Sequence, residues 1–174
     1  MKKTLYFFLL TIIMGMTLGS CQKEKKTNLD ISGKIVNSTS CKNFIKKAGT
    51  GQIADSVSCV EYVFDPSRNL LILRHINAGF NCCPDDLYCT IQLRNDTILL
   101  REYEAAALCD CNCLYDLDIE ITGVAPGKYQ VLFMEPYVDD QEKLHFGIHL
   151  PEQTHGSFCV TRKQYPWGVT SITY

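Results

Sequence analysis

The stretch that decides the fold is Cys109-Asp110-Cys111-Asn112-Cys113-Leu114-Tyr115-Asp116, together with Asn81-Cys82-Cys83-Pro84 and Cys89 upstream. These segments hold six of the ten cysteines, and both clusters lie where a strand-like run meets turn-forming residues. If the chain is extended there, the three cysteines of the first stretch project to one side, whereas the adjacent Cys82 and Cys83 project to opposite sides. We therefore expect sulfur chemistry to hold the middle of the fold.

The first twenty residues have the order of a secretory leader. Two lysines at positions 2 and 3 give a short positive region, residues 5–17 form an apolar run, and two small residues precede Cys21. The apolar run is too short and too close to the N-terminus for a membrane span, which needs about 18 apolar residues or more. The leader therefore directs the chain out of the cytosol.

Leu18-Gly19-Ser20-Cys21, at the expected cleavage site, resembles the lipobox of bacterial lipoproteins. In that family a peptidase cuts before the cysteine, whose sulfur carries a diacylglyceryl group and whose new amino terminus is acylated, for example with palmitate. The resemblance implies a signal peptide over 1–20, a lipidated Cys21 and a polar tether over 21–29. Two or three acyl chains hold a domain to a bilayer almost permanently, since each buried methylene contributes about 0.8 kcal/mol. The alternative is an ordinary secretory signal in which Cys21 is incidental.

Gln22 follows the cysteine that we expect to be lipidated. Lipoproteins retained in the inner membrane of double-membrane bacteria carry an aspartate there, so the resemblance implies the outer membrane, with the periplasmic and surface faces both open. No later apolar run approaches the roughly 18 residues of a membrane span. We therefore expect a cell-envelope protein that is anchored by lipid and not inserted.

Length and charge limit the remaining classes. Removing 1–20 from the 174 residues leaves 154, which is the size of one domain, and we place that domain at 30–174. The formal net charge is −2, and loss of the two leader lysines makes it −4. A mildly acidic domain lacks the basic footprint of nucleic-acid binding, so we expect no nucleic-acid partner.

Beyond the tether, the chain consists of short strand-like runs separated by turn residues. In the clearest run, 115–121, Leu117, Ile119 and Ile121 alternate with three acidic residues that we expect on a solvated face. We expect strands over 30–36, 59–64, 70–76, 87–93, 97–104, 115–121, 129–134, 144–150, 157–162 and 169–174, and a short helix over 41–47. This pattern predicts an all-β, antiparallel β-sandwich, Ig-like or related, with at most one short helix.

The turns between consecutive strands predict which strands pair. We expect three hairpins, formed by 59–64 with 70–76, by 87–93 with 97–104, and by 144–150 with 157–162. We also expect 129–134 to lie beside 115–121, because Ala125-Pro126-Gly127-Lys128 between them is a turn by composition.

Nine cysteines belong to the domain, and outside the cytosol their default state is a disulfide framework. They are Cys41, Cys59, Cys82, Cys83, Cys89, Cys109, Cys111, Cys113 and Cys159. Nine is an odd number, so at least one cysteine is left over. Adjacent cysteines bond only with strain, so bridges between the two clusters are favoured, while the connectivity stays open. One such bridge, Cys83 to Cys109, closes a loop of about 27 residues and is worth roughly 3.5 kcal/mol.

A zinc site is the alternative use of the sulfurs. Its ligands would be Cys109, Cys111 and Cys113, joined by Cys82, Cys83 or His75. The spacing Cys-x-Cys-x-Cys is not the Cys-x-x-Cys of common zinc sites, and an oxidising compartment competes for the thiolates. We therefore expect no metal and no cofactor.

The sequence contains no nucleophile elbow, no phosphate-binding glycine loop and no His-Glu-x-x-His motif, and His75 belongs to no motif. Tyr137, Tyr165 and Trp167 stand beside loop-forming proline or glycine residues, where aromatic side chains anchor interfaces and stack on sugars. The leading hypothesis is a module that binds a protein or a glycan. These aromatics can instead pack at the ends of the sandwich.

Two other classes stay open. An envelope hydrolase with a non-local active site requires an enclosed cleft lined by at least two convergent ionisable residues, whereas a binding module predicts shallow surfaces. A metal-binding protein requires the clustered cysteines to be reduced.

Overall fold

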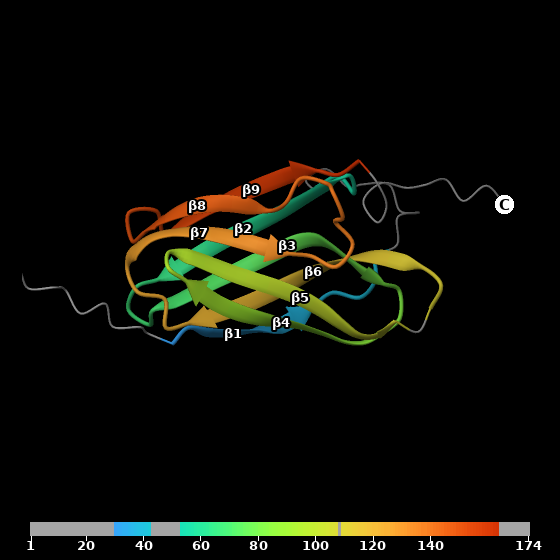
Figure 1. Cartoon of the computed structure of the whole chain (residues 1–174), viewed down its shortest axis with the longest axis horizontal. Coiled ribbons are helices and arrows are strands. Elements are labelled where there is room, and N and C mark those ends of the chain that lie inside the picture. The colour runs from blue at the N-terminus through green and yellow to red at the C-terminus, as the bar shows by residue number, and fades with distance from the viewer. Residues whose placement is uncertain (1–29, 43–52, 108, 164–174) are drawn as a thin grey trace, which may run out of the picture.

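Nine β-strands in two facing sheets make up the computed structural model, which describes residues 30–42, 53–107 and 109–163 (Figure 1). The first sheet has the order β1 (Ser32–Ser38), β6 (Asn112–Thr122), β3 (Leu70–Asn81), β2 (Val57–Asp65) and β9 (His155–Thr161). The second has the order β4 (Pro84–Arg94), β5 (Thr97–Ala107), β7 (Gly127–Met134) and β8 (His145–Leu150). The described residues contain no helix, and the predicted all-β sandwich is confirmed.

The core lies between the sheets because the strands alternate apolar and polar side chains. On β6, Leu117, Ile119 and Ile121 are fully buried, as the sequence predicts, and β1 and β3 pair with this strand on either side. Ile98 and Leu100 of β5 are equally buried and belong to the same core. Each fully buried Leu or Ile side chain contributes about 1.5–3 kcal/mol to folding.

Four connections carry the chain from one sheet to the other, and two of them make predicted pairings wrong. The turn after β6 leaves its sheet at Gly123, whose φ is 79°, and the Val124 N–H donates to the Asn69 carbonyl (3.0 Å). β7 therefore lies beside β5 and β8, and not beside β6. The turn after β8 crosses back, so β9 pairs with β2 and not with β8. The other two predicted hairpins, β2 with β3 and β4 with β5, are confirmed.

β5 and β7 run parallel, so the second sheet is mixed, whereas the first is antiparallel throughout. The parallel pairing arises because β6, the strand between them in sequence, lies in the other sheet and runs in the opposite direction. β7 then runs back in the same direction as β5. In this pair Thr97 aligns with Gln130, and Arg101 aligns with Met134.

The first strand is shifted two residues toward the C-terminus from its predicted position, 30–36. After β1, the Thr39 N–H donates to the Asp116 carbonyl, and the Thr39 hydroxyl accepts from the Asp116 N–H, both at 2.9 Å. Most of the predicted helix over 41–47 and the predicted strand over 169–174 lie outside the described residues; Cys41 and Lys42 are not helical. None of the described segments is a helix long and apolar enough to cross a membrane.

The sandwich has two distinct ends (Figure 1). Asp30 leads into β1 at one end, where the turns 66–69, 95–96, 123–126 and 151–154 also lie, and we call it the Asp30 end. The opposite end contains 38–42, 82–86, 109–111 and 135–143, and we call it the disulfide end.

Four disulfides brace the fold, and the expected bridging between the two cysteine clusters is confirmed. The bonds join Cys41 to Cys113, Cys59 to Cys159, Cys82 to Cys111 and Cys83 to Cys109. Cys89 is the free cysteine of the described residues. The expected extended run is wrong before Asn112, where β6 begins, because Cys109 and Asp110 lie in a bend. The three cysteines of this stretch therefore reach three separate partners.

Candidate functional site

Ionisable side chains occupy inward positions of the core near the disulfide end. His75 is in phase with the buried leucines of β3, and Glu102 is in phase with the buried apolar residues of β5. Glu135 and Arg162 come directly after β7 and β9. Alternation along β3 and β5 turns the first two residues inward, and the ends of β7 and β9 bring the other two beside them. We call these four residues the ionic cluster, and they lie next to Ser58 of β2.

His75 is the centre of the cluster. Its Nδ1 lies 2.7 Å from Glu102 Oε1, and its Nε2 lies 3.0 Å from Ser58 Oγ and 3.6 Å from Glu135 Oε1. The His75 and Glu102 side chains have no exposed surface, and that of Glu135 is 1% exposed. Both ring nitrogens therefore have polar partners in a site closed to water.

Arg162 forms the second half of the cluster. Its Nη2 donates to both carboxylate oxygens of Glu135, at 2.8 and 2.7 Å, and its Nη1 donates to the carbonyl of Glu142. The Arg162 side chain has no exposed surface. This residue therefore ties the end of β9 to the segment 135–143 at the disulfide end.

Each ion pair crosses from one sheet to the other. His75 and Arg162 belong to the first sheet and its continuation, whereas Glu102 and Glu135 belong to the second. With His75 protonated, two positive and two negative groups balance, which is the condition under which buried charges are tolerated.

The pKa shifts within the cluster have identifiable causes. Burial lowers the pKa of His75, but the neighbouring carboxylates of Glu102 and Glu135 outweigh burial, and the pKa is raised above its usual value. Burial raises the pKa of Glu135 above its usual range, against the pull of His75 and Arg162. Both groups therefore hold a proton more tightly in the folded protein than in the unfolded chain.

Ser58, His75 and Glu102 follow the hydroxyl–imidazole–carboxylate order of a nucleophilic triad. The order alone does not make an active site, because a substrate must reach the hydroxyl. Ser58 and His75 are both 0% exposed, and the Glu135 carboxylate lies beside the imidazole nitrogen that would act as base. In this structure these residues form a buried hydrogen-bonded contact between the two sheets.

Cys89 lies beside the ionic cluster as the direct cross-strand partner of Glu102. Burial, with a smaller effect of the Glu102 carboxylate, raises the pKa of the Cys89 thiol to about 11. A thiol with such a pKa is almost entirely protonated at neutral pH and is a poor nucleophile. Cys89, the free cysteine of the described residues, is therefore a weakly nucleophilic thiol in the folded state.

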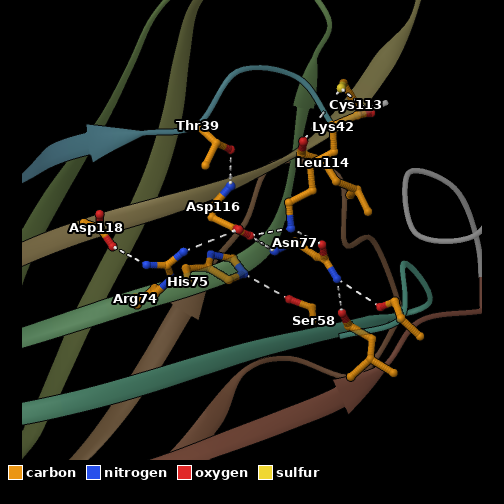
Figure 2. A network of polar contacts seen from close by, with 12 residues as sticks. Thr39, Lys42, Ser58, Arg74, His75, Asn77, Cys113, Leu114, Asp116 and Asp118 are labelled. Atoms are coloured by element: carbon orange, nitrogen blue, oxygen red, sulfur yellow. Dashed lines mark hydrogen bonds and ion pairs between the residues drawn. The ribbon is translucent and has the colours of Figure 1, made fainter. Parts of the chain in front are cut away.

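Figure 2 shows a second polar network, at a bulge of β3 near the disulfide end. Asn77 has φ 63° there, and its Nδ2 donates to the carbonyls of Ala54 (3.0 Å) and Val57 (2.6 Å). Lys42 Nζ lies 2.6 Å from Asn77 Oδ1 and 2.5 Å from Asp116 Oδ1. The bulge thus fixes the chain on both sides of residues 43–52.

The acidic face of β6 differs from the solvated face that the sequence predicts. The Asp116 side chain is only 15% exposed, and it pairs with Lys42 and, at 3.8 Å, with Arg74. Asp118 is paired as well, because it accepts a hydrogen bond from Asn37 (2.9 Å) and lies 3.8 Å from Arg74. These carboxylates hold the strands of the first sheet together.

The predicted binding residues fall in different places. Tyr137 lies at the disulfide end, where its ring packs against Leu114 and Val138 and its hydroxyl donates to Glu104 Oε1 (2.5 Å). Its ring is thus partly buried at the end of the sandwich. Tyr165, Trp167 and the lipidation residue Cys21 lie outside the described residues.

A stacked aromatic pair, the exposed Tyr88 and the half-buried Tyr103, lies on the outer face of the second sheet. The rings are stacked, with centroids 5.1 Å apart and planes inclined by 11°, and Tyr88 is 44% exposed. Neither tyrosine is among the predicted binding residues, although the predicted hairpin of 87–93 with 97–104 contains both.

The disulfides exclude the zinc site considered above. Cys109, Cys111 and Cys113 are each bonded to another cysteine and offer no thiolate. Among the described residues, no three or more His, Cys, Asp or Glu side chains are placed to hold a metal ion.

The ionic cluster is the main feature that sequence reasoning missed. Its signal was present, because Glu102 and His75 occupy the same alternating phase as the core residues of their strands. Comparisons with protein-family models, with curated proteins and with solved structures find no match to this chain. Fold and site together define a disulfide-braced β-sandwich domain with a sealed ionic cluster.

Proposed function

We propose that this protein is a lipid-anchored binding module of a bacterial cell envelope, attached to the outer membrane by acyl chains on Cys21. The leader that ends in Leu18-Gly19-Ser20-Cys21 supports the anchor. The four disulfides support export, because such bonds persist outside the cytosol. The partner is a protein or a glycan.

The observation that carries the proposal is that the chain enters the sandwich at one end and the disulfide-braced loops lie at the other. The chain enters the domain at Asp30, and the disulfide-braced loops lie at the opposite end (Figure 1). β3 alone has 12 residues and spans roughly 40 Å. A lipid anchor that precedes Asp30 thus leaves the disulfide end as the part of the domain that extends farthest from the bilayer.

The disulfide end has the rigidity that a binding surface needs. The Cys82–Cys111 and Cys83–Cys109 bonds fix the start of β4 and the connections 82–83 and 109–111. Arg162 and the hydroxyl of Tyr137 hold the neighbouring segment 135–143. Loops fixed before binding lose little conformational entropy when a partner docks, and this raises affinity.

A hydrolase is the second candidate, and the buried cluster argues against it. The order of Ser58, His75 and Glu102 favours nucleophilic chemistry, but none of the three side chains is accessible. A binding module needs no such access. We therefore place the function on the surface of the disulfide end and not in the ionic cluster.

Photo-crosslinking on intact cells tests the proposal. A photoreactive amino acid replaces the exposed Asp110 or Asp140 at the disulfide end, or the exposed Arg68 at the Asp30 end as a matched control. We expect a specific crosslinked partner from 110 and 140 and none from 68. Equal crosslinking from all three positions, or none from the disulfide end, contradicts the proposal.

A further inference from the structure

Asn81, the last residue of β3, lies between the two cysteine clusters. Its Oδ1 accepts hydrogen bonds from the N–H groups of Cys83 (3.0 Å) and Cys109 (3.2 Å), and its Nδ2 donates to the Cys109 carbonyl (2.5 Å). Asn81 is 4% exposed. One buried side chain therefore clamps the backbones of two cysteines that are bonded to each other.

The backbone of Asn81 is fixed as firmly as its side chain. Its N–H donates to Glu104 Oε2 at 2.6 Å, and its carbonyl accepts from the Tyr115 hydroxyl at 2.9 Å. The same hydroxyl also reaches the Cys82 carbonyl at 3.2 Å. The backbone of Asn81 is thus held in a fixed position, directly before Cys82 and Cys83 in the chain.

The ladder between β3 and β6 accounts for one of the two bridges. Asn81 pairs with Asn112, so continuing the antiparallel register places Cys82 opposite Cys111. The Cys82 N–H donates to the Cys111 carbonyl at 3.0 Å, as this register requires. Strand pairing by itself therefore aligns the Cys82–Cys111 bond.

The second bridge does not follow from the ladder. The same register places Cys83 opposite Asp110, yet Cys83 bonds to Cys109, one residue further on. The chain bends at Cys109 and Asp110 to bring this sulfur into reach. The three side-chain hydrogen bonds of Asn81 are made to these two cysteines and hold that bend.

We propose that Asn81 is a positioning residue for oxidative folding, which selects the native bridges over the crossed pair Cys82–Cys109 and Cys83–Cys111. Exchange from crossed to native pairs needs a thiol catalyst but no net oxidation. A glutathione thiolate attacks Cys82 and expels the Cys109 thiolate, which attacks Cys83 and expels the Cys111 thiolate. Cys111 then attacks Cys82, closes the native bond and releases glutathione.

The test is refolding of the reduced chain, lacking its leader and carrying Cys21→Ser and Cys89→Ala, in a mixture of reduced and oxidised glutathione. Cleavage before Asp110 separates Cys109 from Cys111, and electron-transfer dissociation breaks the backbone between Cys82 and Cys83. Mass spectrometry then gives the ratio of crossed to native bridges. We expect this ratio to stay low with Asn81 in place and to rise at least about tenfold in Asn81→Ala, which loses three hydrogen bonds.

Two further variants separate positioning from stability. Asn81→Asp keeps the acceptor for Cys83 and Cys109, so we expect it to restore native pairing. Asn77→Ala removes a buried asparagine of the same strand whose side chain bonds, among the described residues, to Lys42, Ala54 and Val57 and to no cysteine, so we expect native pairing there too. An unchanged ratio in Asn81→Ala, or equal scrambling in Asn77→Ala, overturns the proposal.

Discussion

His75 Nδ1 and Glu102 Oε1 lie 2.7 Å apart between the two sheets, and neither side chain has any exposed surface. One partner comes from β3 and the other from β5, so the contact joins the sheets through polar atoms where apolar packing is the rule. Together with the Arg162–Glu135 pair, it makes sheet packing near the disulfide end depend on charge balance.

Breaking the Arg162–Glu135 pair from one side is expected to be costly. Glu135→Met removes the carboxylate that balances Arg162, and guanidinium does not give up its proton. We expect a loss of about 3–5 kcal/mol in the free energy of unfolding, measured by urea denaturation. The control is Glu152→Gln, because Glu152 is 60% exposed and its pairing with His149 is worth about 1 kcal/mol or less.

Removing both partners is expected to cost less than removing one. The double variant Glu135→Met with Arg162→Met leaves no buried charge at this position, and an apolar replacement of a buried ion pair is often neutral. A double variant that is as unstable as Glu135→Met would show that packing, and not charge balance, determines the cost.

Stability is expected to depend on pH through His75. The folded pKa is raised above the usual 6.5, so the stabilisation is complete below about pH 6.5 and is lost as the pH rises through the folded value. The pKa of Glu135 is also raised, and its contribution likewise falls as the pH rises through its folded value. Urea midpoints measured from mildly acidic to alkaline pH test this, with His75→Gln expected to flatten the alkaline part of the profile.

Cys89 is expected to resist alkylation in the folded protein. Its pKa of about 11 leaves only about one thiol in a thousand ionised at pH 8, and the side chain is partly buried. Iodoacetamide should therefore modify Cys89 slowly in native buffer and fast in urea. Mass spectrometry of the two samples measures the difference, and equal rates would place the thiol on the surface.

Ser58 is expected not to react with fluorophosphonate probes. The reagent labels serines that an imidazole activates in an open site, and Ser58 is 0% exposed despite its 3.0 Å contact with His75. Intact mass before and after treatment gives the labelled fraction, with Ser58→Ala as the control. Labelling of the native protein that disappears in Ser58→Ala would favour a hydrolase over a binding module.

Local periodicity was sufficient to predict most of the strands. Leu117, Ile119 and Ile121 alternate with acids, so β6 and its buried face follow from side-chain spacing. The choice of sheet does not, because Ala125-Pro126-Gly127-Lys128 looks like a hairpin turn by composition, whereas the chain leaves for the opposite sheet at Gly123. Turn residues indicate where a strand ends, but they do not indicate which strand the next one pairs with.

The ionic cluster and the disulfide connectivity could not be predicted for related reasons. Glutamate is usually exposed, so Glu102 was assigned to no core position even though its phase is inward. Its burial depends on pairing with His75 of the other sheet, and the proximity of these two residues is a result of the fold. The Cys83–Cys109 bond depends on a bend that Asn81 holds, and spacing alone does not encode that bend.

The most direct test of the central claim is the mass of the protein extracted from membranes, before and after alkylation. We expect a chain that begins at Cys21 with two or three acyl chains, one cysteine alkylated after denaturation without reduction, and eight more after reduction. A soluble, unprocessed chain that retains residues 1–20 and has reduced thiols would contradict the account.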